Sequence, residues 1–210
     1  TPGSGWEVKT PVNAEHMFDI ATLDGTDLWL FGGDQSTAYA WRSTDDGATW
    51  SIAQTHNLNP ENGDDSERYY WGAALDGKMY MQSHVYSTAN EAQIFDGTNW
   101  TTGTTDAICG TGDSSRGPGP VEFNDKLICP DYMGHVYPYN GQTSDDYNLL
   151  YNTDCSPSTH CYSGWQKPYV FTASDKLYLL NIGYTGNQES EYHSSLIFSN
   201  NLEDWQQYNG

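Results

Sequence analysis

Basic residues are scarce in this chain. It has 8 Lys and Arg against 28 Asp and Glu, so its formal net charge is −20 over 210 residues. Phosphate backbones and anionic lipid surfaces repel such a protein, which argues against nucleic acid and membranes as partners. No apolar run approaches the roughly 20 residues that a membrane-spanning helix needs, so we expect no membrane insertion. The charge favours neutral glycans, cations or basic proteins.

Several catalytic and metal-binding motifs are also missing. The sequence contains no Cys-x-x-Cys pair, no His-Glu-x-x-His, no Gly-x-Ser-x-Gly and no Gly-rich phosphate loop. These absences argue against a zinc site, a nucleophile-elbow hydrolase and a nucleotide-binding protein.

The four cysteines allow three disulfide pairings. Cys155 and Cys161 bracket a short Ser/Pro/Thr loop, so we expect them to bond to each other and Cys109 to pair with Cys129. Disulfides form in oxidising compartments, which predicts a secreted, extracellular protein. The first residues, Thr1-Pro2-Gly3, do not have the pattern of a signal peptide, and we expect this start to be a mature or trimmed end.

The sequence is rich in residues that favour short strands and turns. Of its residues 14% are aromatic, and there are 21 Gly. A turn followed by an apolar strand recurs at Leu28, Met79, Leu127 and Leu177, which are 51, 48 and 50 residues apart. Several strands in a period near fifty residues predict an all-β fold, a small β-propeller with about four four-stranded antiparallel blades. A β-sandwich is the alternative.

The whole chain, residues 1–210, is predicted to be one propeller domain. A further strand at residues 5–10 has no preceding partner strand, and it either closes the ring on the last blade or belongs to an incomplete fifth blade. The four repeat units span residues 14–55, 68–105, 116–151 and 165–208.

The most distinctive stretch is Ser43–Trp50, which reads Ser-Thr-Asp-Asp-Gly-Ala-Thr-Trp. Asp45 can accept bonds from nearby amides, and Gly47 allows a positive φ. This stretch resembles the Asp-box, Ser-x-Asp-x-Gly-x-Thr-Trp, of sialidases and related β-propellers. The resemblance implies a structural hairpin between the two outermost strands of a blade, away from the ligand face. Weaker copies end at Trp100 and Trp205, and the last also resembles turns of five-bladed arabinanase-type hydrolases.

Candidate binding residues gather where the first strand of each unit begins. If these starts converge near the axis, they bring aromatic rings and guanidinium groups together. Aromatic faces stack on sugar rings and Arg forms forked hydrogen bonds, so the pattern predicts lectin-like carbohydrate binding. The competing interpretation is that the rings pack between blades and the Arg residues neutralise acids. The candidates are Arg68, Tyr70, Trp71, Arg116, Trp165 and Tyr169.

An enzyme on the same scaffold is the first alternative. A glycoside hydrolase needs two carboxylates across a cleft, and Asp19 and Glu122 lie on first strands of different units. A polysaccharide lyase would use a Tyr or His base beside Arg68 or Arg116. Sialidase activity is disfavoured because the chain has three Arg residues and lacks the Arg-Ile-Pro signature of that family.

The second alternative is an acidic extracellular interaction module. The pairs Asp64-Asp65 and Asp145-Asp146 offer oxygen ligands for Ca²⁺, but neither has the spacing of a known calcium loop. We therefore expect no cofactor, with Ca²⁺ as the only candidate metal. The sequence leaves the oligomeric state open.

Overall fold

The structure, a computed structural model, describes residues 16–34, 37–57, 68–84, 92–102, 108–109, 119–130, 135–139, 151–152, 169–184 and 192–207. Every regular element among them is a β-strand. No helix in this described part is long and apolar enough to cross a membrane.

In the described part of the chain, sixteen strands form four separate four-stranded antiparallel sheets. Blade A contains β1 (His16–Thr22), β2 (Leu28–Gly33), β3 (Thr37–Ser43) and β4 (Ser51–Asn57). Blade B contains β5 (Arg68–Leu75), β6 (Lys78–His84), β7 (Ala92–Phe95) and β8 (Trp100–Thr102). Blade C contains β9 (Val121–Glu122), β10 (Leu127–Pro130), β11 (His135–Tyr139) and β12 (Tyr151–Asn152). Blade D contains β13 (Tyr169–Ala173), β14 (Lys176–Tyr184), β15 (Tyr192–Ser199) and β16 (Gln206–Gln207).

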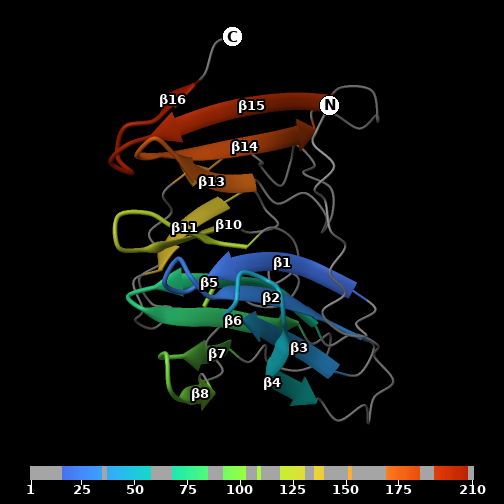
Figure 1. Cartoon of the computed structure of the whole chain (residues 1–210). Helices are drawn as coiled ribbons and strands as arrows, with labels where there is room; N and C mark the ends of the chain where they lie inside the picture. The colour runs from blue at the N-terminus through green and yellow to red at the C-terminus, as the bar shows by residue number, and fades with distance from the viewer. Residues whose placement is uncertain are drawn as a thin grey trace, which may run out of the picture.

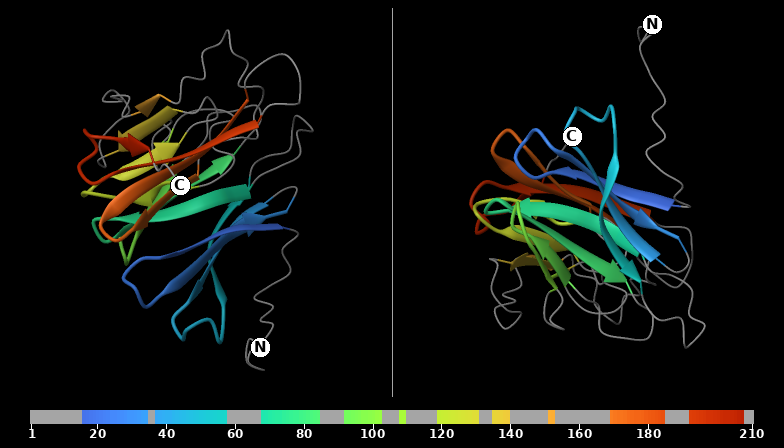
Figure 2. Two further views of the ribbon diagram at one scale, coloured as in Figure 1. Left: turned by 90° about the horizontal axis from the view of Figure 1, so that it is seen from above. Right: turned by 60° about the horizontal axis from the view of Figure 1, so that its bottom comes forward.

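The sheets are arranged as the blades of a β-propeller. Within each sheet the strands pair in chain order. The first strands β1, β5, β9 and β13 contact one another in succession and lie toward the middle of the molecule, while β4, β8 and β16 lie toward its periphery (Figure 1). Two further views show the same four groups of strands fanning apart (Figure 2). The predicted four-bladed propeller is confirmed.

The apolar core is divided among the spaces between successive blades. Along the second strand of each blade, successive side chains point to opposite faces of the sheet. Trp29 and Phe31 of β2 face blade B, where they meet Tyr69, Met79 and other residues. Two further clusters fill the spaces between B and C and between C and D. Each blade is therefore held mainly by its neighbours along the chain.

The Ser43–Trp50 turn joins β3 to β4, the two outer strands of blade A, as predicted. Asp45 accepts hydrogen bonds from the Thr49 amide at 2.8 Å and from Thr49 Oγ1 at 2.6 Å. The Gly47 amide donates to Ser43 Oγ at 2.9 Å, and Gly47 has a φ of 80°. The two hydrogen bonds from Thr49 lower the pKa of Asp45 to about 2. The turn is a self-contained structural unit on the rim.

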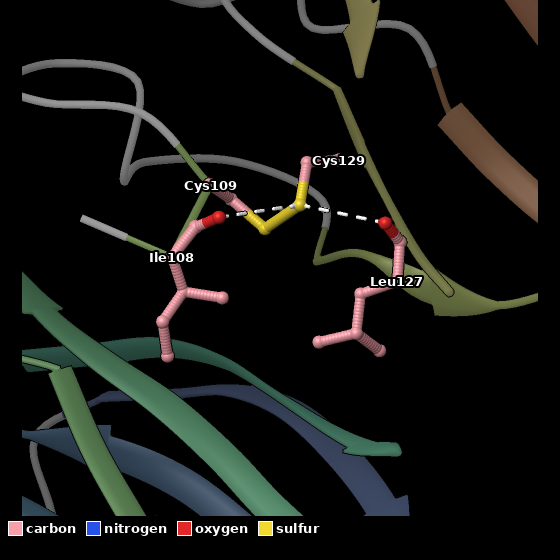
Figure 3. The surroundings of a disulfide bond; sticks show 4 residues. All are labelled: Ile108, Cys109, Leu127 and Cys129. Atoms are coloured by element: carbon pink, nitrogen blue, oxygen red, sulfur yellow. Dashed lines mark hydrogen bonds between the residues drawn. A yellow bond between two sulfur atoms is a disulfide. The ribbon is translucent and has the colours of Figure 1, made fainter. Parts of the chain in front are cut away.

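The predicted disulfide between Cys109 and Cys129 is present (Figure 3). Both cysteines are buried in the cluster between blades B and C. The Cys129 sulfur lies 3.7 Å from the Ile108 carbonyl oxygen, which is beside the segment that leads into blade C. The bond therefore ties the B–C connection to β10. The predicted partners Cys155 and Cys161 lie outside the described residues.

Candidate functional site

Two inner strands bulge side by side. The register of β1 shifts between Met17 and Asp19, and that of β5 shifts between Tyr69 and Gly72. Such bulges bend a strand and re-aim its side chains, and they are common beside functional sites. Here the Phe18 and Tyr70 rings meet with their centroids 4.5 Å apart. The Phe18 side chain is 42% exposed, so the pair presents an aromatic surface to solvent.

Asp19 follows Phe18 in β1, and backbone amides of blades A and B donate hydrogen bonds to its carboxyl group. Asp19 Oδ2 accepts a hydrogen bond from the Gly72 amide of blade B at 3.2 Å, and Oδ1 accepts one from the Ile20 amide at 2.9 Å. A Cβ added to Gly119, just before β9, would lie 3.0 Å from Oδ2 and 2.6 Å from Cβ of Trp71. The carboxyl therefore sits where the inner strands of three blades converge.

Burial raises the pKa of Asp19, although the hydrogen bonds from Gly72 and Ile20 lower it. Removing a carboxylate from water disfavours its charged form, so desolvation outweighs the two amide donors here. A carboxyl group with a raised pKa can donate or accept a proton or a hydrogen bond at a bound hydroxyl.

The structure separates the sequence-predicted residues of β5. Tyr70 is partly buried and contacts Phe18. Trp71 is fully buried in the cluster between blades B and C, so its ring packs between blades and is closed to a ligand in this structure. Arg68 begins β5, where it pairs with His84. Of the three, Tyr70 is the one whose ring joins the site.

Glu122 lies at a different level from Asp19. Glu122 pairs with Leu127, the first residue of β10. In blade A the first residue of β2 is Leu28, and it pairs with Thr22. Glu122 thus corresponds to Thr22, three positions beyond Asp19, a displacement of about 10 Å along the strands. Glu122 also lines an open depression of about 600 Å³ formed by the turns of blades C and D. Pairing of the two carboxylates across a cleft stays a prediction.

The remaining candidates lie away from this site or outside the described residues. Tyr169 begins β13 and is 55% exposed. Arg116 and Trp165 are not among the residues that the structure describes. Among the residues that it does describe, no group of three or more His, Cys, Asp or Glu could hold a metal ion. The Asp64-Asp65 and Asp145-Asp146 pairs lie outside the described residues, so the Ca²⁺ hypothesis stays a prediction.

Phe18 is a residue of the site that sequence reasoning missed. A Phe on an inner strand reads as a core residue, yet Met17, Phe18 and Ile20 of β1 are all exposed. A signal was present, because apolar residues stand at Met17, Phe18 and Ile20 around a single acid. That pattern breaks the strict alternation of a regular strand.

Solved structures resemble this fold across nearly the whole chain. An endo-arabinase from Bacteroides thetaiotaomicron VPI-5482 matches 94% of this chain and 80% of its own, with a TM-score of 0.51 and 14% identity. A GH43 β-1,3-galactosidase matches 94% and 76%, with a TM-score of 0.50 and 11% identity. No protein-family model matches the chain, and no curated protein sequence matches it either. At these identities the likeness establishes the class, a β-propeller.

Proposed function

We propose that this chain is a secreted carbohydrate-binding β-propeller whose site lies where β1 and β5 bulge. The observation that carries this proposal is the contact of Phe18 with Tyr70, beside the partly buried Asp19. Aromatic faces stack on the C–H faces of sugar rings, while a carboxylate accepts hydrogen bonds from hydroxyls. The endo-arabinase and the β-1,3-galactosidase of similar fold have carbohydrate substrates, which makes glycans the first ligand class to test.

The charge and the disulfide support the rest of this proposal. A net charge of −20 disfavours polyanionic ligands, so neutral polysaccharides fit better than acidic ones. The Cys109–Cys129 disulfide is consistent with an oxidising, extracellular compartment. Arg68, Arg116 and Trp165 remain proposed contacts around the same end of the inner strands.

A glycoside hydrolase is the second candidate, and one observation favours it. Burial raises the pKa of Asp19, as a carboxyl group that donates a proton to a leaving group requires. Glu122 is the proposed partner, but the register sets it about 10 Å along the strands from Asp19. That displacement along the strands alone exceeds the roughly 6.5–9.5 Å between the two carboxyl groups of inverting enzymes, which is why binding is proposed first.

Two parallel measurements distinguish a carbohydrate-binding module from a glycoside hydrolase. The full chain is applied to a glycan array and, in parallel, incubated with arabinan and galactan in a reducing-sugar assay. Binding without turnover supports the binding module. Turnover that is lost in Asp19→Asn supports the hydrolase. Silence in both assays overturns both and leaves an acidic interaction module.

Variants then locate the site. Losing one stacking contact costs about 0.5–1.5 kcal/mol, so Phe18→Ala and Tyr70→Ala should each weaken glycan binding by roughly 2- to 10-fold. Ile52→Ala is the matched control, because Ile52 is 50% exposed on the outer strand β4. If all three variants bind like the unmodified chain, the site lies elsewhere.

A further inference from the structure

One motif of the sequence has no part in the proposed carbohydrate site. Asn99-Trp100-Thr101 has the Asn-x-Thr pattern that accepts an N-linked glycan, and the chain contains no other Asn-x-Ser or Asn-x-Thr. Such a pattern is a modification site only where the Asn lies at the surface of a secreted protein. The structure describes all three residues of the motif, and so it places the acceptor amide.

The motif lies at the outer edge of blade B. Asn99 ends the turn that joins β7 to β8, and Trp100 and Thr101 begin β8. β8 is the last strand of its sheet and lies toward the periphery of the molecule (Figure 1). Asn99 and Thr101 are exposed, whereas Trp100 is partly buried, with its ring centroid 6.0 Å from that of Trp29 in blade A. The two side chains that define the motif therefore face solvent, while the ring between them anchors the strand.

The turn that presents Asn99 is held mainly by backbone groups. Asp96 Oδ1 accepts hydrogen bonds from the Asn99 amide at 2.7 Å and from the Thr98 amide at 2.9 Å, and the Asp96 amide donates to the Asn99 carbonyl oxygen at 3.1 Å. The two amide donors are the largest causes of a lowered pKa of Asp96, and a bond from the Asn99 side chain contributes less. A side-chain amide has two N–H groups, so a glycan on the nitrogen leaves one for that bond.

The residue before the box Trp is used differently in blades A and D. In blade A this residue is Thr49, whose Oγ1 donates to Asp45 at 2.6 Å. In blade D it is Asp204, whose Oδ2 accepts from Asn201 Nδ2 at 2.9 Å. Both side chains are tied into their own turns. The corresponding side chain of blade B, Asn99, is a smaller contributor to its turn and is exposed, which favours modification there.

The exposed amide lies at the end of blade B that is far from the candidate carbohydrate site. The charge of Lys78 also lowers the pKa of Asp96, and Lys78 begins β6 directly after β5 ends at Leu75. The turn of Asn99 is therefore at the end of the blade where β5 finishes. Tyr70 stands five positions before Leu75, about 15 Å back along the strand. A glycan on Asn99 would leave the aromatic pair of the site open.

We propose that Asn99 carries an N-linked glycan when the chain passes through a eukaryotic secretory route. The donor is an oligosaccharide linked to a polyprenyl diphosphate. The side-chain nitrogen of Asn99 bonds to C1 of the first sugar, while the bond from C1 to the diphosphate oxygen breaks. The amide gives up one proton, and the polyprenyl diphosphate leaves with the electron pair. This inference rests on secretion, which is part of the proposed function.

Mass spectrometry on the full chain, secreted from a eukaryotic host behind a signal peptide of that host, tests the proposal. The chain should carry one glycan, on the peptide that contains Asn99, and peptide N-glycosidase should remove it and leave Asp in its place. Asn99→Gln and Thr101→Ala should lose the glycan, whereas Thr101→Ser should keep it. Asn124→Gln is the matched control and should also keep it, because Asn124 is an exposed turn residue outside any such motif.

Two results would overturn the modification site. One is a folded, secreted chain whose Asn99 is unmodified, and the other is a glycan mass that survives in Asn99→Gln. Binding on the glycan array is measured separately and should be unchanged in Asn99→Gln; a loss of binding there would contradict the placement of Asn99 away from the carbohydrate site. A glycosylated chain that binds nothing on the array would refute the proposed function alone, so the two failures are distinguishable.

Discussion

Gly72 should tolerate no side chain, because the ring of Phe31 occupies the space where a Cβ would stand. A Cβ built on Gly72 overlaps three carbons of that ring, the farthest at 2.5 Å, and Phe31 is fully buried between blades A and B. Overpacking a core costs about 1–3 kcal/mol. For a domain of this size each kcal/mol lowers Tm by about 2–4 °C, so Gly72→Ala should lose roughly 2–12 °C.

The same substitution should also disturb the candidate site, since the Gly72 amide donates to Asp19. Differential scanning calorimetry measures the Tm change, and Phe31→Leu tests the cause. If the ring clash is responsible, Phe31→Leu in the Gly72→Ala background restores part of the lost Tm. Gly77→Ala is the control, because Gly77 has a φ of 68° and no heavy atom within 4 Å, so that Phe31→Leu should not rescue it. Additive losses for Gly72→Ala and Phe31→Leu would refute the reasoning.

Three further predictions follow from charge and covalent structure. Because burial raises the pKa of Asp19, the folded state loses stability relative to the unfolded state as pH rises through that pKa; Asp19→Asn should therefore raise Tm at pH 7, with an advantage that shrinks toward pH 3 in a Tm–pH series. The pKa of Asp45 is held at about 2, so its contribution to stability is full above about pH 4 and is lost as pH falls through 2; Asp45→Ala should lower Tm at pH 7 and lower it much less at pH 2. Asp46→Asn, at an exposed position with a φ of 55°, should change Tm little at either pH. The Cys109–Cys129 bond closes a sequence separation of 20 residues, which constrains the unfolded chain by about 3 kcal/mol; replacing both cysteines with Ser should lower the free energy of unfolding in urea by about that amount, and an unchanged value would contradict the chain-entropy explanation.

The repeat period predicted the blades because the cause is local and repeated. Each second strand has an apolar residue at its first or second position after a turn, and the register confirms that Leu28, Met79, Leu127 and Leu177 occupy equivalent places. Alternation then assigns the two faces of every blade. The blade pattern and the two faces of each blade do not depend on long-range contacts, so composition and spacing were sufficient to predict them.

The site was predicted less well because bulges change which way side chains point. Under strict alternation Tyr69 and Trp71 would face the same blade. With the bulge, Tyr69 joins the cluster between blades A and B, while Trp71 joins the one between B and C, against which Tyr70 also packs. An inserted residue of this kind leaves no mark in the repeat period. The level of Glu122 relative to Asp19, by contrast, follows from counting back from Leu127 and Leu28, and it was available in the sequence.

Among the described residues, the apolar core forms three thin layers, each shared by two consecutive blades. Such a chain behaves as a row of units coupled only to nearest neighbours, so its stability is a sum of unit and interface terms. A substitution in the A–B layer should destabilise blades A and B most, with an effect that decays toward blade D. In the part of the chain that the structure describes, blades A and D each share one such layer, so they should open first, and opening of an end blade exposes the next interface in turn.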